Sequence, residues 1–304
     1  MKTSLLYIIA LMTFFGCKQQ GGKQHHRLPV VVTTTGMIAD AVANIAGDSA
    51  VVMPLMGPGV DPHLYKATQG DLAKLTNADI IFYNGLHLEG KMAEILEKLG
   101  RTKPVIPVSK DIPLNLLRTS TQYNNQYDPH IWFDASLWKI AVNTISGQLT
   151  AEYPGMKAYF EANTETYSQR LDSLGNWVRE QMSQIPEKQR VLITAHDAFG
   201  YFGRAYKIDV KGLQGISTLS EFGLRDITEL VTFIVENRIK AVFIETSVSE
   251  RSINAVVEGC GERGFEIVIG GSLYSDAMGE PGTPEGNYIG MFRSNVNKIV
   301  NALK

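Results

Sequence analysis

Short apolar runs alternate with helical patterns along most of the chain. Each run rich in β-branched residues is followed by a stretch in which apolar side chains recur every three or four positions. This alternation favours a parallel sheet with helices on both faces. In the first half of the chain, the predicted strands are residues 28–34, 50–55, 80–83 and 105–108, and the predicted helices are residues 37–46, 69–76 and 92–99.

The second half repeats this scheme. Its predicted strands are residues 191–194, 208–213, 241–245 and 266–269, and its predicted helices are residues 198–206, 224–237 and 249–263. The predicted fold class is therefore α/β, with two lobes that each contain a four-stranded, mainly parallel sheet and flanking helices. The expected lobe boundaries are 28–153 and 187–304.

The most regular helical pattern lies between the lobes, at residues 154–186. It begins at Pro154, a favourable first helical residue, and ends at Pro186. Roughly 30 helical residues would span about 45 Å. The pattern predicts one long, rigid linking helix, which would limit opening to small lobe tilts and loop motion. Two shorter helices broken near Gly175 are the alternative.

The N-terminus is typical of an export signal. Lys2 precedes an apolar run from Leu5 to Phe15, which is shorter than the roughly 20 residues that span a bilayer. Gly16 and Cys17 follow, which indicates a lipoprotein signal over residues 1–16 with a lipid on Cys17. Ordinary secretion with an unmodified Cys17 is the alternative. The polar segment 17–27 is interpreted as a flexible tether to the membrane, so the protein is expected on the periplasmic or cell-surface side of the cytoplasmic membrane.

Composition narrows the choice of partners. The chain has 304 residues, 44% of them hydrophobic, which is enough for a large core. Its net charge of −2 gives no electrostatic reason to bind nucleic acid. Once Cys17 is lipidated, Cys260 is the only remaining thiol, so no intramolecular disulfide is possible. A monomer is expected.

Four side chains of metal-ligand type stand out. They are His63 in GVDPHLY, His130 in YDPHIWFD, His196 in TAHDAFGYF and Asp276 in GGSLYSDAMGE. We expect each to follow an apolar strand directly or after a short loop, and the carboxyl ends of parallel strands are where ligands bind. The proline before His63 and the one before His130 restrict the backbone. A single histidine after a strand is usually structural, so the hypothesis of one metal site depends on the whole set.

The other histidines are weaker candidates. His87 in NGLHLEG is interpreted as a helix cap or surface residue near the cleft. His25 and His26 lie in the tether, which cannot preorganise a site.

With these motifs in view, the chain resembles the metal-binding lipoproteins of bacterial ABC importers for zinc and manganese, the TroA-like cluster A-I substrate-binding proteins. The resemblance covers the mature chain, including the closing segment SDAMGEPGTPEGNYIGMFRSNV. It implies two α/β lobes that clamp one divalent ion and deliver it to a membrane permease driven by a cytoplasmic ATPase. By motif, the implied ligands are His63, His130, His196 and Asp276.

The identity of the metal is a separate question. Three imidazoles and one carboxylate suit Zn²⁺, and intrinsic affinity rises from Mn²⁺ towards Zn²⁺. Manganese-selective members of the family often have glutamate at the position of His196, which also favours zinc. Zinc-selective members often have a His-rich loop before the second ligand, whereas this chain has RTSTQYNNQYDPH. Zn²⁺ is the preferred prediction, with Mn²⁺ or Fe²⁺ as alternatives.

A ligating histidine is usually oriented by a partner on its other ring nitrogen. The candidates for this role are Asp61, Asp128, Asp197 and Glu245. Because histidine binds metal in its neutral form, affinity is expected to fall near or below pH ~6.5.

Two rival functions remain. A periplasmic zinc hydrolase would use Glu245 as a general base, but catalytic zinc normally keeps one position open for water, and the sequence has no HExxH motif. The protein is therefore not expected to be an enzyme. An adhesin or metal buffer that never delivers to a transporter is equally compatible with lipid tethering.

Overall fold

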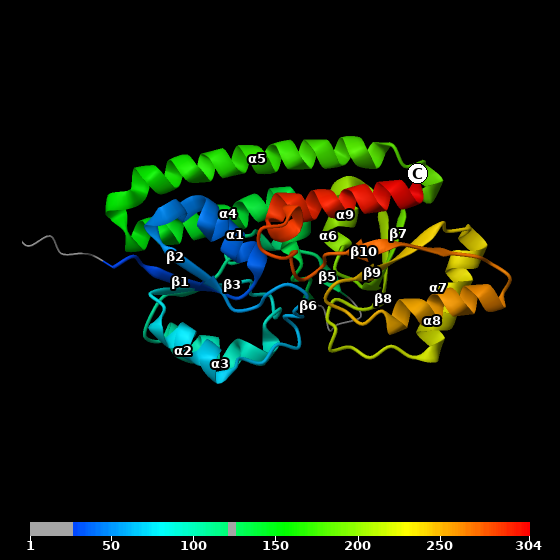
Figure 1. The fold of residues 1–304 in the computed structure, drawn as a ribbon, viewed down its shortest axis with the longest axis horizontal. Helices are drawn as coiled ribbons and strands as arrows, with labels where there is room; N and C mark the ends of the chain where they lie inside the picture. Colours follow the sequence, from blue (N-terminus) through cyan, green and yellow to red (C-terminus); the bar gives the residue numbers. More distant parts are fainter. Residues whose placement is uncertain (1–26, 121–125) are drawn as a thin grey trace, which may run out of the picture.

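The computed structural model describes residues 27–120 and 126–304, so the predicted signal, Cys17, His25 and His26 lie outside the described residues. Figure 1 shows two lobes side by side beneath one long helix, α5. Within the described ranges, the structure contains no helix that is both long and apolar enough to cross a membrane.

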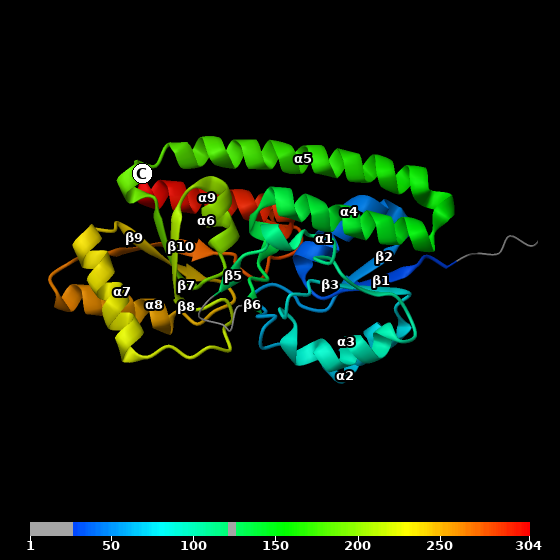
Figure 2. The same ribbon diagram turned by 180° about the vertical axis from the view of Figure 1, so that it is seen from behind.

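The N-terminal lobe contains a four-stranded parallel sheet with the strand order β2-β1-β3-β4. Helices α2 and α3 cover one face, and α1 covers the other (Figures 1 and 2). The predicted strands are confirmed to within two residues at each end. The bounds are β1 Val30–Thr33, α1 Gly36–Ala46, β2 Val51–Pro54, α2 Gln69–Asn77, β3 Ile80–Tyr83, α3 Ala93–Gly100 and β4 Val105–Pro107.

The C-terminal lobe has two parallel pairs, β7 with β8 and β9 with β10, and β7 lies beside β9. The last strand lies further along the chain than predicted, because the Gly270-Gly271 pair interrupts its apolar run and Gly271 has φ +143°. The bounds are β7 Val191–His196, α6 Gly200–Tyr206, β8 Asp209–Gln214, α7 Leu224–Asn237, β9 Ala241–Glu245, α8 Arg251–Glu262 and β10 Val268–Leu273.

The predicted linking helix is present and unbroken. A 3₁₀ turn, η6 (Pro154–Met156), leads into α5 (Lys157–Ser183), which continues through Gly175. Its buried stripe packs against helices of both lobes, namely α1, α4 and α9. Figure 2 shows α5 running over both lobes from end to end.

Sequence analysis did not predict two helices, α4 (Ala135–Glu152) and α9 (Tyr288–Leu303). Asp134 caps the first and Asn287 caps the second, each accepting a backbone N–H bond. We call α1, α4, α5 and α9 the roof of the molecule. They cover a single hydrophobic core that contains residues of both lobes.

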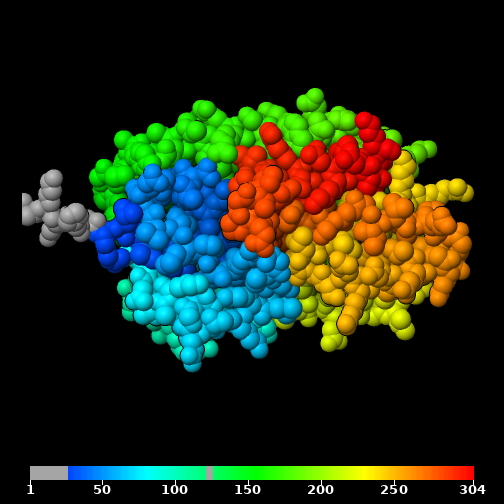
Figure 3. All heavy atoms as spheres, in the orientation of Figure 1, coloured from blue at the N-terminus to red at the C-terminus, as the bar shows by residue number. Residues whose placement is uncertain are grey.

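The side opposite the roof is built differently. There the N-terminal lobe has its own small core around Leu75, under α2 and α3, and the C-terminal lobe has another around Ile234, under α7 and α8. Since a shared close-packed core resists separation, the lobes are joined at the roof and are more free to move apart on the opposite side. In Figure 3 the surfaces of the lobes are in contact on the face shown.

Candidate metal centre

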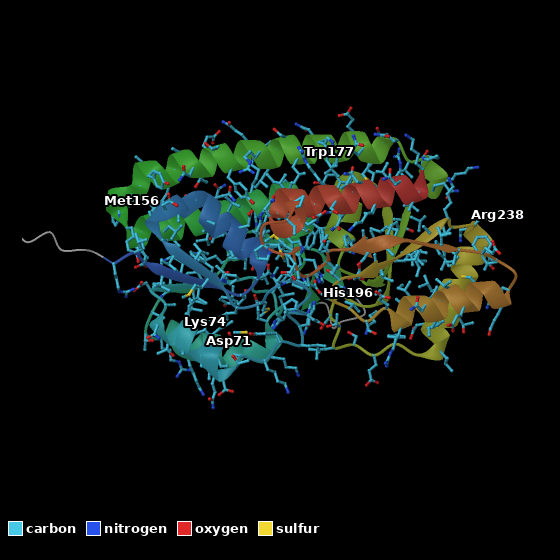
Figure 4. The ribbon with its side chains drawn as sticks, in the orientation of Figure 1. Asp71, Lys74, Met156, Trp177, His196 and Arg238 are labelled. Atoms are coloured by element: carbon cyan, nitrogen blue, oxygen red, sulfur yellow. The ribbon has the colours of Figure 1, made fainter. Side chains whose placement is uncertain are left out.

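The structure brings the four predicted side chains together where the lobes meet. His63 lies in loop 55–68, after β2, and His196 is the last residue of β7. Asp276 lies in the loop after β10, and His130 directly precedes the 3₁₀ turn η5. All four are buried, and their candidate ligand atoms lie within 4.8 Å of one another. Figure 4 labels His196 near the centre of the molecule, between the lobes.

The segment before His130 differs from the prediction. It is not an apolar β-branched strand but β6 (Gln126–Tyr127), which pairs antiparallel with β5 (Thr119–Ser120) in a small hairpin. The hairpin returns the chain to the cleft, and η5 (Ile131–Phe133) turns it into the roof helix α4. His130 therefore reaches the site from the junction of the lobes rather than from the edge of a sheet.

The spacing of the four side chains suits one small ion. His130 Nε2 lies 3.4 Å from Nε2 of both His63 and His196. Asp276 places Oδ1 3.4 Å from His130 Nε2 and Oδ2 3.3 Å from His196 Nε2. The corners of a tetrahedron with central bonds of about 2.0–2.1 Å, the Zn–N distance, are about 3.3–3.4 Å apart. The two contacts between imidazole nitrogens match that spacing, and each Asp276 oxygen lies at a similar distance from one ring nitrogen.

Asp276 provides the negative charge of the site. Both of its carboxylate oxygens are buried and make no hydrogen bond within the part of the chain that the structure describes. Burial alone would raise its pKa, but the facing rings of His196 and His130 hold the pKa well below its usual range. A buried carboxylate needs a cation or hydrogen-bond donors. A metal ion bound between the three rings would be that cation.

Glu245 orients His196. One carboxylate oxygen, Oε1, accepts the His196 backbone N–H at 2.9 Å, and Oε2 lies 2.6 Å from ring Nδ1. Although burial opposes a charged ring, the carboxylates of Glu245 and Asp276 hold the pKa of His196 well above its usual range. This partner on Nδ1 leaves Nε2 directed at the cluster, as a metal ligand requires.

Asp128 does the same for His130. Its Oδ1 accepts both the backbone N–H of His130 at 2.9 Å and the ring Nδ1–H at 2.8 Å. Burial opposes the charge on the ring, but the hydrogen bond to Asp128 and the nearby negative charge of Asp276 raise the pKa of His130 to about 9. Arg118 donates to the other oxygen of Asp128 at 2.6 Å.

The other two candidates for orienting a ring do not contact one. Asp61 Oδ1 accepts only the backbone N–H of His63, at 2.8 Å, and its Oδ2 accepts from Thr218. Asp197 lies 3.8 Å from Arg118, and burial together with nearby Asp128 raises the pKa of Asp197 to about 6. Asp61 stands two residues before its histidine, as Asp128 does, and Asp197 directly follows His196, but side chains so close in sequence can point in different directions. The structure therefore gives neither carboxylate a contact with a ligating ring among the described residues.

The His63 ring is different from the other two. No carboxylate orients it in the described part of the chain, and burial lowers its pKa to about 3. His87, the remaining candidate from the sequence, is exposed in a left-handed turn with φ 65° and is outside the cluster.

Sequence analysis missed two residues that support the site. The Trp132 ring lies edge-on to His130, with centroids 5.2 Å apart, and its Nε1–H donates to the carbonyl of Ser275, next to Asp276. Arg118 lies against Gly200, where a Cβ would overlap its guanidinium group. Trp132 belongs to the motif that contains His130, but no sequence pattern shows which carbonyl an indole will reach.

The arrangement is suited to binding rather than to acid–base chemistry. It offers three imidazole nitrogens and up to two carboxylate oxygens around one point, and Asp128 and Glu245 already hold the outer ring nitrogens of His130 and His196. Four protein side chains would fill a tetrahedral site, whereas catalytic zinc keeps a position for water.

Known proteins share this architecture. The profile of the family described as "Zinc-uptake complex component A periplasmic" matches residues 31–302. The manganese-binding lipoprotein MntA of Bacillus subtilis is 51% identical over 307 aligned positions, covering 100% of both chains. The zinc-binding protein TroA of Treponema pallidum is 49% identical over 275 positions, covering 90% of this chain and 89% of TroA. A solved structure of TroA superposes with a TM-score of 0.88 at 48% identity, covering 91% of this chain and 99% of the TroA chain.

Proposed function

The chain belongs to the family of zinc-uptake complex component A proteins, and from that premise we propose that it captures one divalent transition metal ion between its lobes and delivers it to an ABC importer. His63, His130, His196 and Asp276 are the proposed ligands, and Zn²⁺ is the proposed cargo. Delivery requires a membrane permease and its cytoplasmic ATPase.

One observation carries the proposal. Four buried donors, two from each half of the sequence, have neighbouring contacts of 3.3–3.4 Å and include a carboxylate with no hydrogen-bond partner among the described residues. Burying three imidazoles and a carboxylate this closely is unfavourable unless a cation binds them together. Because the donors come from both lobes, binding is coupled to closure.

The donor set favours Zn²⁺. Imidazole nitrogen suits zinc, and at equal geometry zinc is bound more tightly than manganese. Mn²⁺ is the second candidate, because Asp276 turns one oxygen towards His130 and the other towards His196. A carboxylate that binds through both oxygens would give five donors, and oxygen ligands suit Mn²⁺. Among the relatives, MntA is named for manganese and TroA for zinc.

Competitive titration tests the function and the cargo together. Metal-stripped protein is titrated with Zn²⁺ and Mn²⁺ by calorimetry, with metal analysis of the product. One tight site per chain that prefers zinc and is lost in His196→Ala supports the proposal. Manganese binding as tight as zinc binding, or tighter, would contradict Zn²⁺ as the cargo. The absence of any tight site would contradict the proposed function.

Delivery needs its own test, because an adhesin or metal buffer would bind equally well. Deleting the gene should lower cellular uptake of the bound metal, and a chain carrying Asp276→Ala should fail to restore it. Uptake that is unchanged after deletion would favour the buffer. The proposed lipid on Cys17 is tested by labelling cells with a fatty acid, since Cys17→Ala should abolish the label and release the protein from the membrane.

A further inference from the structure

Three of the four proposed ligands belong to one fixed block. The segment that carries His130 is N-terminal in sequence, but its hydrogen bonds reach the C-terminal lobe. Trp132 Nε1–H donates to the Ser275 carbonyl at 2.9 Å, and the Tyr288 hydroxyl donates to the Trp132 carbonyl at 2.6 Å. Tyr201 of α6 donates to the carbonyl of Asp128 at 3.0 Å. These bonds tie His130 to the lobe that carries the other two.

Packing strengthens this block. Phe133, in the turn after His130, lies with its ring centroid 4.3 Å from that of Phe199 and 6.0 Å from that of Phe292, both of the C-terminal lobe. These rings are fully buried in the core beneath the roof. Displacing His130 from His196 and Asp276 would therefore disrupt a close-packed aromatic cluster.

His63 lies outside this block. Loop 55–68 is anchored at its start to its own sheet, where the N–H groups of Leu55 and Met56 donate to carbonyls of β1 and the residue after it. Beyond that anchor the loop is more open, and Leu64, next to His63, is 48% exposed. A ligand on such a loop can leave the site without disrupting the shared core.

One contact holds this loop against the other lobe. Thr218 Oγ1 donates to Asp61 Oδ2 at 2.6 Å. Among the residues that the structure describes, it is the only side-chain hydrogen bond between loop 55–68 and the C-terminal lobe apart from the contact between ligand rings. Because the other oxygen of Asp61 accepts the His63 backbone N–H, the bond acts directly on the ligand's backbone.

Thr218 is held in place for this contact. It lies in the turn after β8, where the Ser220 backbone N–H and hydroxyl both donate to the Ser217 carbonyl, at 3.0 and 2.6 Å. The side chain of Gln214, at the end of β8, donates to the Ser220 carbonyl at 2.9 Å and so ties the turn to its strand. The position of the hydroxyl is thus set by the C-terminal lobe rather than by Asp61.

We propose that Thr218 is a positioning residue for metal capture, and that its hydrogen bond to Asp61 holds the His63 loop closed over a three-ligand site already formed by His130, His196 and Asp276. The inference rests on the proposed function. The ion would bind the three fixed ligands first, and His63 would complete the site as the loop reaches Thr218. Release would begin with the loss of the same hydrogen bond.

The dissociation rate of Zn²⁺ tests the inference. Zinc-loaded protein is mixed with excess chelator in a stopped-flow instrument, for wild type, Thr218→Val and Thr218→Ser. Thr218→Val removes the hydroxyl at nearly constant volume, so dissociation should become about tenfold faster, the effect expected for the loss of one hydrogen bond to a charged group. Stoichiometry should stay at one ion per chain, and Thr218→Ser should dissociate at close to the wild-type rate.

Thr228→Val is the matched control. It makes the same chemical change on α7, where the hydroxyl donates only to the Leu224 carbonyl of its own helix, and it should leave the dissociation rate unchanged. If Thr218→Val folds poorly, Thr218→Ala replaces it and should show the same acceleration.

The possible outcomes separate the two proposals. Tight zinc binding by wild type, with a wild-type dissociation rate in Thr218→Val, would overturn the role of Thr218 and leave the function intact. Acceleration in Thr218→Ser as large as in Thr218→Val would also overturn it, because the hydroxyl would then not be the cause. If the wild-type protein bound zinc only weakly, the proposed function itself would be contradicted.

Discussion

The same tripeptide, Asp-Pro-His, occurs twice in the N-terminal lobe and ends in two different environments. In both copies an aspartate oxygen accepts the backbone N–H of the histidine two residues later, for His63 at 2.8 Å and for His130 at 2.9 Å. Beyond this local turn they diverge. Asp128 also holds the ring of its histidine, whereas Asp61 turns its second oxygen away to Thr218.

The electrostatics of the two rings diverge accordingly. Carboxylates on both nitrogens raise the pKa of His130 to about 9 against the effect of burial, whereas burial lowers the pKa of His63 to about 3. The comparison shows what the tripeptide determines and what it does not. A short motif sets the backbone turn, but the position of its loop relative to the other lobe determines the chemistry of the ring.

Replacing each histidine should produce the largest difference between the two tripeptides. We expect both His63→Ala and His130→Ala to weaken zinc binding by more than about a hundredfold, because the loss of a ligand should exceed the 10–100-fold effect of an outer partner. His130→Ala should weaken zinc binding more than His63→Ala, since it also leaves the Asp128 carboxylate buried without its ring partner. Calorimetric titration measures both affinities, and a larger loss in His63→Ala would contradict the fixed three-ligand site.

Changing each aspartate sharpens the comparison. Asp128→Asn should lower zinc affinity about 10–100-fold, the usual effect of losing the partner of a ligating histidine. Asp61→Asn keeps an oxygen for the His63 backbone N–H and touches no ring, so its effect should be smaller. The two variants are matched in chemistry and in sequence context. Equal losses in the same titration would show that the two aspartates play the same role.

The pH dependence of binding should come from His130 and His196, whose pKa values are raised, and not from His63. A metal ion must displace the proton that His130 carries below its pKa of about 9, whereas His63, with a pKa of about 3, carries none near neutral pH. Apparent affinity should therefore rise by about tenfold per pH unit or more between pH ~6.5 and ~9. This range lies above the one expected from an unperturbed histidine.

Titrations from pH 6 to 9.5 would measure this dependence. Asp128→Asn removes a carboxylate that favours the proton, so its profile should move to lower pH. A wild-type affinity that is constant above pH 7 would contradict the role assigned to His130.

Stability of the metal-free protein should show the same contrast with a smaller effect. The pKa of His130 is higher in the folded than in the unfolded protein. Its contribution to the free energy of unfolding is therefore fully present below pH ~6.5 and is lost as pH rises through about 9. The pKa of His63 is lowered in the folded protein, so its contribution to the free energy of unfolding is present above pH ~6.5 and is lost as pH falls towards 3. Thermal unfolding followed from pH 5 to 9.5 should show an alkaline decline that is reduced in Asp128→Asn. An equal decline in both proteins would contradict this assignment.

Local patterns were sufficient to predict the two-lobed fold, because alternating strands and helices are encoded by short-range periodicity. The linking helix and the strand Ala241–Glu245 were predicted closely for this reason. The helix α4 was not, because its apolar residues cover more than half of its circumference within the roof and leave little periodic signal. The strand β10 was misplaced because its glycines resemble a turn.

The site was predictable as far as its four candidate ligands and no further. Histidines and an aspartate in distinctive motifs could be recognised one by one, and the structure brings them together. Which carboxylate contacts which ring depends on side-chain directions that only packing sets, so Asp128 and Glu245 lie against a ring, whereas Asp61 instead accepts from Thr218. Contacts across the lobes, such as that between Trp132 and Ser275, have no short-range signal at all.

The most direct test of the account is a crystal structure of the zinc-loaded protein with the ion located by anomalous scattering. The account predicts one peak per chain, about 2.0–2.1 Å from Nε2 of His63, His130 and His196, with Asp276 as the fourth ligand. A peak elsewhere, or an ion held by three of these side chains and an exchangeable water, would contradict it.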